Sequence, residues 1–171
     1  ASKRTPDEWV VFDMAAYAIL TDGIEDAPRI SADAVQNYVN LAIDGLNKSY
    51  TLPKDRAKAE IIMGVLGIDT TKLYPVNSNA AVDNAAKLTQ MAAQADQYAA
   101  PYVLLADLQG NAGLTSEQVN SLIGVLKANM GTGLFSYEWD GVTYASPDTA
   151  GAALAALAKY YGTSADAKAV V

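Results

Sequence analysis

Hydrophobic and polar positions recur along this chain with the period of an α-helix. In residues 115–129, Val119, Leu122, Ile123 and Leu126 fall at i, i+3, i+4 and i+7, with polar residues between them. This spacing places the four side chains on one face of a helix. Similar stripes predict half-exposed helices over residues 31–47 and 77–94.

Other segments are apolar on nearly every side. A helix without a polar face is expected to be covered all round. The pattern therefore predicts an inner layer of buried helices wrapped by an outer layer of half-exposed ones. The inner helices are expected at residues 9–20, 61–66, 102–108 and 150–158.

Residues that favour helix starts stand before most of these segments. Thr5, with Pro6 at the first helical position and Glu8 closing a capping box, predicts one start. Thr115 with Gln118 predicts another. Further starts are expected at Ser31, at Asn77 or Ser78, and at Ser146 before Pro147.

Glycine follows each of the four apolar segments. Gly23, Gly67, Gly110 and Gly162 stand at intervals of 44, 43 and 52 residues. Glycine ends helices readily because it adopts the left-handed conformation without a Cβ clash. A period of this length predicts a repeat of helix pairs. We therefore expect an all-α fold, an array of about four helical hairpins in a single domain over residues 1–171.

The longest interval contains an aromatic segment, "FSYEWDGVTY", near residues 135–145. Its alternation predicts a β-hairpin with Phe135, Tyr137 and Trp139 on one side and Val142 and Tyr144 on the other. The dipeptide Asp140-Gly141 suits the two positive-φ positions of a type I′ turn.

Composition narrows the function classes. Hydrophobic residues make up 51% of the chain, charged residues 18%, and the net charge is −7. Because the 12 basic residues are scattered, nucleic acid is not an expected partner. No apolar run reaches the length of a membrane span. The start at Ala1 without Met predicts a mature or trimmed piece of a longer protein.

The chain has no cysteine and no histidine. This excludes thiolate and imidazole metal sites and every Ser-His or Cys-His catalytic pair. A site made only of carboxylates, for Ca²⁺ or Mg²⁺, stays open, but the sequence predicts no particular metal site and no cofactor.

The segment "DTAGAALAALAKYYG" resembles the repeat helix of the α/α-toroid superfamily of prenyltransferases and squalene and terpenoid cyclases. "WVVFDMAAYAIL" and "PYVLLADLQG" are similar to inner helices of the same superfamily. The resemblance implies part of an α/α toroid, in a secreted or cell-surface bacterial protein. Relatives with this fold include non-catalytic ligand-binding domains. The matching residues in the first segment are Asp148, Thr149, Ala150, Leu154, Ala156 and Leu157.

The chain departs from the catalytic members. It lacks the Cys and His of the zinc site, and Asp148 stands alone where the cyclases have a run of aspartates. The leading hypothesis is therefore a non-catalytic domain that binds a small molecule or a protein, or other domains of its own chain. A cyclase or transferase fragment with Asp148 as its acid is one alternative, and a structural spacer is the other.

The candidate ligand-binding residues are aromatic, apart from Asp148. An aromatic platform at the hairpin suits a flat or sugar-like ligand, although the same side chains could pack on the ends of adjoining helices. Tyr98 and Tyr102, four residues apart, are expected on one helix face, lining a cavity or packing in the core. The full set is Phe135, Tyr137, Trp139, Tyr144, Asp148, Tyr98 and Tyr102.

Overall fold

The structure, a computed structural model, describes residues 7–24, 29–109, 112–130 and 135–171. Helices dominate these residues, and the two strands form one small sheet. In chain order the elements are α1 (Glu8–Leu20), α2 (Ala32–Leu46), α3 (Pro53–Val65), α4 (Asn84–Met91), the 3₁₀ helix η1 (Ala92–Gln94), α5 (Ala100–Leu108), α6 (Ser116–Asn129), β1 (Ser136–Trp139), β2 (Val142–Ala145), α7 (Pro147–Leu157) and α8 (Ala165–Val170). The prediction of a helical protein with one β-hairpin is confirmed.

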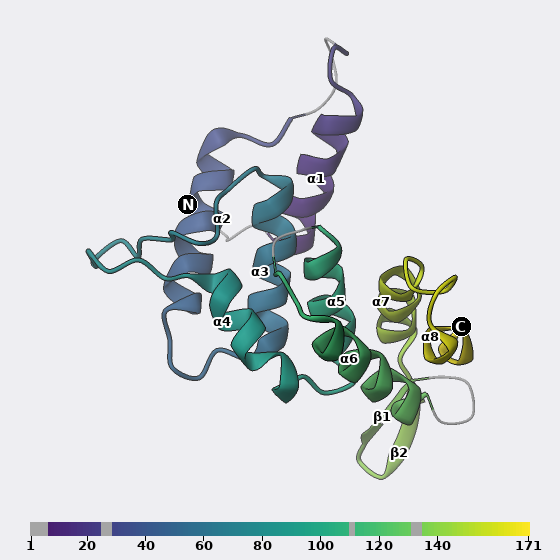
Figure 1. The fold of residues 1–171 in the computed structure, drawn as a ribbon. Coiled ribbons are helices and arrows are strands. Elements are labelled where there is room, and N and C mark those ends of the chain that lie inside the picture. Colours follow the sequence, from purple (N-terminus) through teal and green to yellow (C-terminus); the bar gives the residue numbers. More distant parts are fainter. Residues whose placement is uncertain (1–6, 25–28, 110–111, 131–134) are drawn as a thin grey trace.

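Helices α3 and α5 lie side by side at the centre of the molecule (Figure 1). The odd-numbered helices pack in chain order, α1 on α3, α3 on α5 and α5 on α7. The even-numbered helices cover them, with α2 and α4 against α3 and α6 against α5. None of the helices in the described residues is long and apolar enough to span a membrane.

Helix α3 contributes to all three clusters of buried side chains. Ala57 and Ile61 belong to the largest cluster, which continues through α5, α6, α7 and α8. Met63 packs in a second cluster with the end of α2 and the loop before α4. Ile62 completes a third cluster with Val11 of α1 and Tyr38 of α2. Within the predicted inner segment 61–66, Ile61, Ile62 and Met63 are buried as expected, whereas residues 64–66 are partly exposed.

The prediction of full burial is wrong for the first apolar helix, α1. Only Val11 and Ala15 of α1 are buried, and Leu20 is 83% exposed. In α7, Leu154 is about half exposed, although four other side chains are buried. Both helices lie at the ends of the packing order and have a central neighbour on one side only. Apolar composition therefore did not separate central helices from terminal ones.

Several predicted helix starts are confirmed by their hydrogen bonds. The Ser31 hydroxyl accepts from Ala34 N, and the Thr115 hydroxyl accepts from Gln118 N at 3.2 Å. The Gln118 side chain accepts in return from Thr115 N, which completes the capping box. Helix α7 begins at Pro147 after Ser146, as predicted.

Two predicted starts are wrong. Asp7, not Thr5, caps α1, because its carboxylate accepts the Trp9 amide hydrogen at 2.9 Å; Thr5 and Pro6 lie outside the described residues. The helix expected from Asn77 or Ser78 begins only at Asn84, with Asp83 as its cap. The intervening chain instead pairs with an earlier loop, through the bridge between Leu73 and Val82.

Of the helix ends predicted at glycine, some are confirmed and one is wrong. Gly23 and Gly67 follow α1 and α3 with φ of 82° and 71°, in the left-handed region. Gly162 does not adopt a positive φ, so its predicted role is wrong. Gly110 lies outside the described residues.

Candidate functional site

The β-hairpin separates its side chains into an aromatic face and a polar face. The register pairs Tyr137 with Tyr144 and Trp139 with Val142, and residues directly opposite in an antiparallel pair project from the same face. The four side chains therefore share one face, which corrects the prediction that Val142 and Tyr144 lie on the opposite side.

This aromatic face is open to solvent. Trp139 is 72% exposed, and Tyr137, Val142 and Tyr144 are each about half exposed. The rings of Tyr137 and Tyr144 stack with centroids 5.5 Å apart and planes 21° from parallel. We call the surface formed by Tyr137, Trp139, Val142 and Tyr144 the aromatic face.

The predicted turn chemistry is confirmed at the tip of the hairpin. Asp140 has φ of 52° and Gly141 has φ of 72°, the two positive values that a type I′ turn requires. A two-stranded ribbon is marginal by itself in water, so contacts at its base are needed to hold it.

Phe135 supplies the first of those contacts. Its side chain is buried in the largest core cluster, so it anchors the hairpin and does not belong to the aromatic face. Its carbonyl accepts a hydrogen bond of 2.7 Å from Ser146 N, across the base of the hairpin. Tyr98 adds a second tether, because its hydroxyl donates to Ser136 O at 3.0 Å.

Asp148 is not part of the aromatic face. It lies in the first turn of α7, exposed, and makes no hydrogen bond or ion pair with any described residue. The neighbouring Thr149 is buried and accepts a hydrogen bond from the Ser146 hydroxyl at 2.7 Å. A carboxylate in the first turn of a helix is favoured by the helix dipole.

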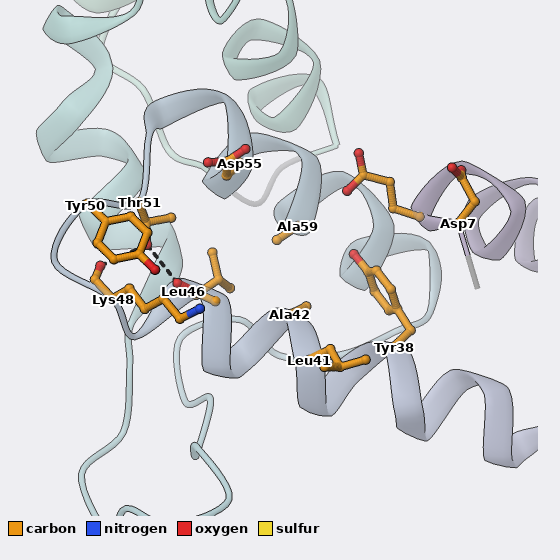
Figure 2. A pocket seen from close by; sticks show the side chains of 12 residues that line it. Asp7, Tyr38, Leu41, Ala42, Leu46, Lys48, Tyr50, Thr51, Asp55 and Ala59 are labelled. Atoms are coloured by element: carbon orange, nitrogen blue, oxygen red, sulfur yellow. Dashed lines mark hydrogen bonds between the residues drawn. The ribbon is translucent and has the colours of Figure 1, made fainter. Parts of the chain in front are cut away.

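A pocket of about 450 Å³ lies between α1, α2 and α3, away from all the predicted site residues. Figure 2 shows Tyr38 and Asp7 at one end of it and Lys48 and Tyr50 at the other. We call this space the α2 pocket. This pocket was not predicted from the sequence. The spacing of Tyr38, Ala42 and Gly45, which places them on one face of a helix, is the pattern that could have indicated it.

Tyr98 and Tyr102 do not lie on one helix face. Helix α5 begins at Ala100, so Tyr98 precedes it and faces the hairpin, whereas Tyr102 faces α1. The ring centroids of Tyr102 and Trp9 lie 6.0 Å apart. Neither tyrosine lines the α2 pocket, so the prediction of a shared face is wrong.

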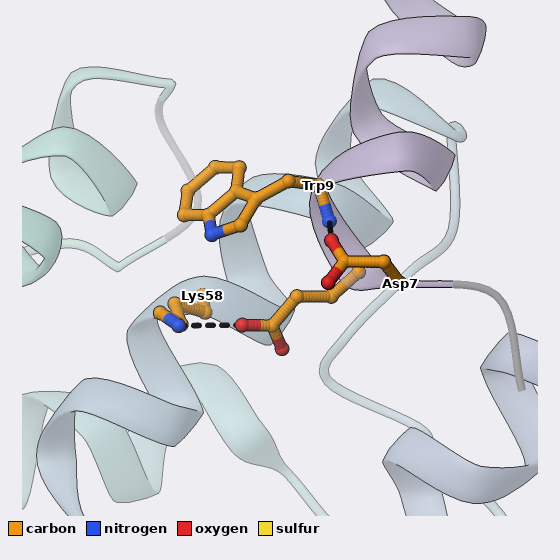
Figure 3. A network of polar contacts seen from close by, with 4 residues as sticks. Asp7, Trp9 and Lys58 are labelled. Atoms are coloured by element: carbon orange, nitrogen blue, oxygen red, sulfur yellow. Dashed lines mark hydrogen bonds and ion pairs between the residues drawn. The ribbon is translucent and has the colours of Figure 1, made fainter.

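The Lys58 side chain contacts both α1 and α5 and so joins α1 to the central helices. Lys58 Nζ lies 5.5 Å from the centre of the Trp9 ring and 5.7 Å from that of Tyr102, within the range of a cation–π interaction. The same ammonium pairs with the Glu8 carboxylate at 2.5 Å. Figure 3 shows Lys58 and Trp9 with the capping contact of Asp7 beside them. These contacts hold α1 against α3 and α5.

A buried polar network, also missed, lies between α3 and α4. Asn84 Nδ2 donates to Glu60 Oε1 at 2.6 Å, and Arg56 Nη1 donates to Asn84 Oδ1 at 2.9 Å. The Thr70 hydroxyl donates to Glu60 Oε2 at 2.7 Å. All four residues are buried. The network joins two helices to the loop between them, so we assign it a structural role.

Comparison with known proteins identifies no similar protein. No protein-family model matches the chain, and neither curated proteins nor solved structures give a significant match. Inferences about function therefore rest on the residues and their geometry.

Proposed function

We propose that this chain is a non-catalytic binding domain of a secreted or cell-surface bacterial protein. Its aromatic face would bind a flat, sugar-like ligand. The observation that carries the proposal is the exposure of Tyr137, Trp139, Val142 and Tyr144 on one side of an anchored hairpin. An array belonging to an α/α toroid remains part of this proposal, supported by the chain order in which α1, α3, α5 and α7 pack.

The anchoring favours a binding role over simple packing. Phe135 already fills the core position at the base of the hairpin, so the other aromatic side chains are not needed there. Tyr and Trp give large contact areas and lose little side-chain entropy on binding. A pyranose ring has a flat face of C–H groups that can lie on such rings, with its hydroxyls directed to water.

Binding can be measured with oligosaccharides of defined backbone, such as cellohexaose, xylohexaose and chitohexaose, by calorimetry and NMR titration. Trp139→Ala and Tyr144→Ala should each weaken binding at least about tenfold, the usual size of a lost aromatic anchor. Trp139→Ala should keep the wild-type Tm, since its side chain is 72% exposed. Tyr144→Ala also removes the stacking on Tyr137 and should lower the Tm slightly. Tyr74→Ala, which removes an exposed tyrosine from the loop between α3 and α4, is the control and should bind normally.

Fluorescence gives a second readout, because Trp9 and Trp139 are the two tryptophans in the chain. In a Trp9→Phe variant, emission comes from Trp139 alone and should shift to shorter wavelength when a saccharide covers the ring. Unchanged emission together with no binding in calorimetry would contradict the proposed ligand class.

The two alternatives make different predictions. A cyclase or transferase with Asp148 as its acid would turn over squalene-like or isoprenoid diphosphate substrates, and Asp148→Asn would abolish turnover without lowering the Tm. A spacer would show no thermal shift with any small molecule. Turnover of those substrates would overturn the non-catalytic proposal.

A further inference from the structure

The α2 pocket exists because small residues face one another across it. Ala42 and Gly45 stand on α2, and Ala59 stands opposite on α3. A Cβ placed on Gly45 would meet no atom within 4 Å, so space opens directly at that backbone. Cavities of a few hundred Å³ are typical of small-molecule sites. The Thr51 hydroxyl fixes the loop after α2, because its one hydrogen is shared between Gly45 O and Lys48 O, each 2.8 Å from Oγ1.

The hydroxyl of Tyr38 lies at one end of this pocket and has no hydrogen-bond partner among the described residues. Tyr38 is only 6% exposed. Burial, with a smaller contribution from the Glu8 charge, raises the pKa of Tyr38 above its ordinary value of 10.0. Among the described residues, Arg56 Nε is the one fully enclosed side-chain nitrogen or oxygen without a hydrogen bond, so the Tyr38 oxygen is not fully enclosed and can be reached from the pocket.

Carboxylates predominate among the charged groups of the lining. Asp7, Glu8 and Asp55 line the pocket together with one lysine, Lys48, whose ammonium lies 5.8 Å from the centre of the Tyr50 ring. One oxygen of Asp7 accepts the Trp9 amide hydrogen and one oxygen of Glu8 pairs with Lys58. The second oxygen of each has no described hydrogen bond and remains an acceptor.

These acceptors do not suit a metal ion. In the described part of the chain, no three acidic side chains converge closely enough to hold one. The middle of the pocket is apolar, with Ala42 and Leu46 on the α2 side and Ala59 on the α3 side (Figure 2). A ligand that matches this lining carries a positive charge at one end and a hydrocarbon body.

We propose that the α2 pocket is a second binding site, for a small organic cation such as a primary amine. Its ammonium donates to Asp7 and Glu8 and to the Tyr38 oxygen, while its hydrocarbon body covers Ala42 and Ala59. The site shares no residue with the aromatic face and does not depend on the saccharide proposal.

The test is an NMR titration of the ¹⁵N-labelled protein with three ligands of similar shape: phenethylamine, 2-phenylethanol and 3-phenylpropionate. The amine should shift the amide signals of Glu8, Tyr38, Ala42 and Gly45 with saturable binding. The neutral alcohol should bind at least about tenfold more weakly, since it forms no charge-assisted hydrogen bond. The carboxylate should not bind.

Two conservative variants test the polar end. Tyr38→Phe should weaken the amine several-fold and leave the Tm unchanged, because no hydrogen bond to a described residue is lost. Asp7→Asn should also weaken it, while keeping α1 capped, since Asn and Asp are equally good caps. Asp33→Asn, at the exposed first turn of α2 outside the pocket, is the matched control and should bind as the wild type does.

A blocking variant tests the space itself. Gly45→Leu fills the pocket and improves helix propensity, so it should abolish amine binding while the Tm holds or rises. Saccharide binding to the aromatic face should persist in this variant, which separates the two proposals. Equal binding of all three ligands, unchanged affinity in Tyr38→Phe and Asp7→Asn, or no saturable shift with the amine would each overturn the proposal.

Discussion

Glu60 is the residue whose environment differs most from that of a surface carboxylate. It is completely buried, and burial raises the pKa of its carboxyl above the ordinary value of 4.5. Hydrogen bonds from Thr70 and Asn84 lower the pKa in part, without cancelling the effect of burial. Breaking such a buried network by removing one member is usually costly, because the remaining polar groups stay buried without partners.

The raised pKa predicts how stability depends on pH. Between 4.5 and the folded-state pKa, Glu60 is protonated in the folded chain and ionised in the unfolded chain. The folded state then binds more protons, so this group's contribution to the free energy of unfolding falls as pH rises through that window. The wild type should therefore lose stability relative to Glu60→Gln as the pH rises above 4.5, as measured by urea unfolding.

Glu117→Gln is the control with the opposite sign. Hydrogen bonds to its own backbone amide and to Thr115 lower the pKa of Glu117. The wild type should therefore lose stability relative to this variant only as the pH falls below the ordinary glutamate value. Parallel pH profiles for the wild type and Glu60→Gln would contradict the assigned effect of burial.

At the scale of single elements, features that depend on neighbouring residues could be predicted from the sequence. The Thr115 and Gln118 capping box and the Asp140-Gly141 turn are confirmed because each is decided within four residues. The start of α4 could not be predicted. It depends on the bridge between Leu73 and Val82, and on Asn84 reaching a network on another helix.

In the candidate site too, local features could be predicted from the sequence and tertiary contacts could not. Alternation predicted a hairpin rich in aromatic residues, but it could not show which of Phe135, Tyr137 and Trp139 is buried and which is exposed. Packing against the core separates them: Phe135 is buried and Trp139 is exposed. Tyr98 joins the hairpin through a hydrogen bond that spans 38 positions in sequence. The α2 pocket needs side chains from three helices, and no local pattern places those helices together.

Helix α6 offers a stability test at this scale. Gly124 lies in the helix interior, and a Cβ placed there would meet no atom within 4 Å. Gly124→Ala should therefore raise the free energy of unfolding by about 0.5–1 kcal/mol, the usual gain for replacing a helical glycine. Gly141→Ala should instead lower it, since φ of 72° disfavours a side chain. Urea unfolding of both variants measures the two effects, and stabilisation by both would contradict this account.

For the whole molecule, the central position of α3 implies that stability is unevenly distributed. Helix α3 belongs to every buried cluster, and α5 packs against α3, α6 and α7. Helix α1 buries only Val11 and Ala15 and presents an apolar outer side that includes Leu20. Segments with few buried contacts open at lower free energy than the global unfolding transition.

Native-state hydrogen exchange should therefore show α1 opening before α3 and α5. The contacts of Trp9 with Tyr102 and Lys58 join α1 to both central helices, so Trp9→Ala should speed exchange throughout α1 and leave α5 amides nearly unchanged. Val103→Ala, within α5, is the contrasting variant, because its buried side chain belongs to the largest cluster and its loss should lower protection in α3, α5 and α7 together. Equal protection of α1 and α3 in the wild type would contradict this prediction and mean that α1 unfolds only with the rest of the molecule. The α2 pocket, which α1 helps to form, would then open only on global unfolding.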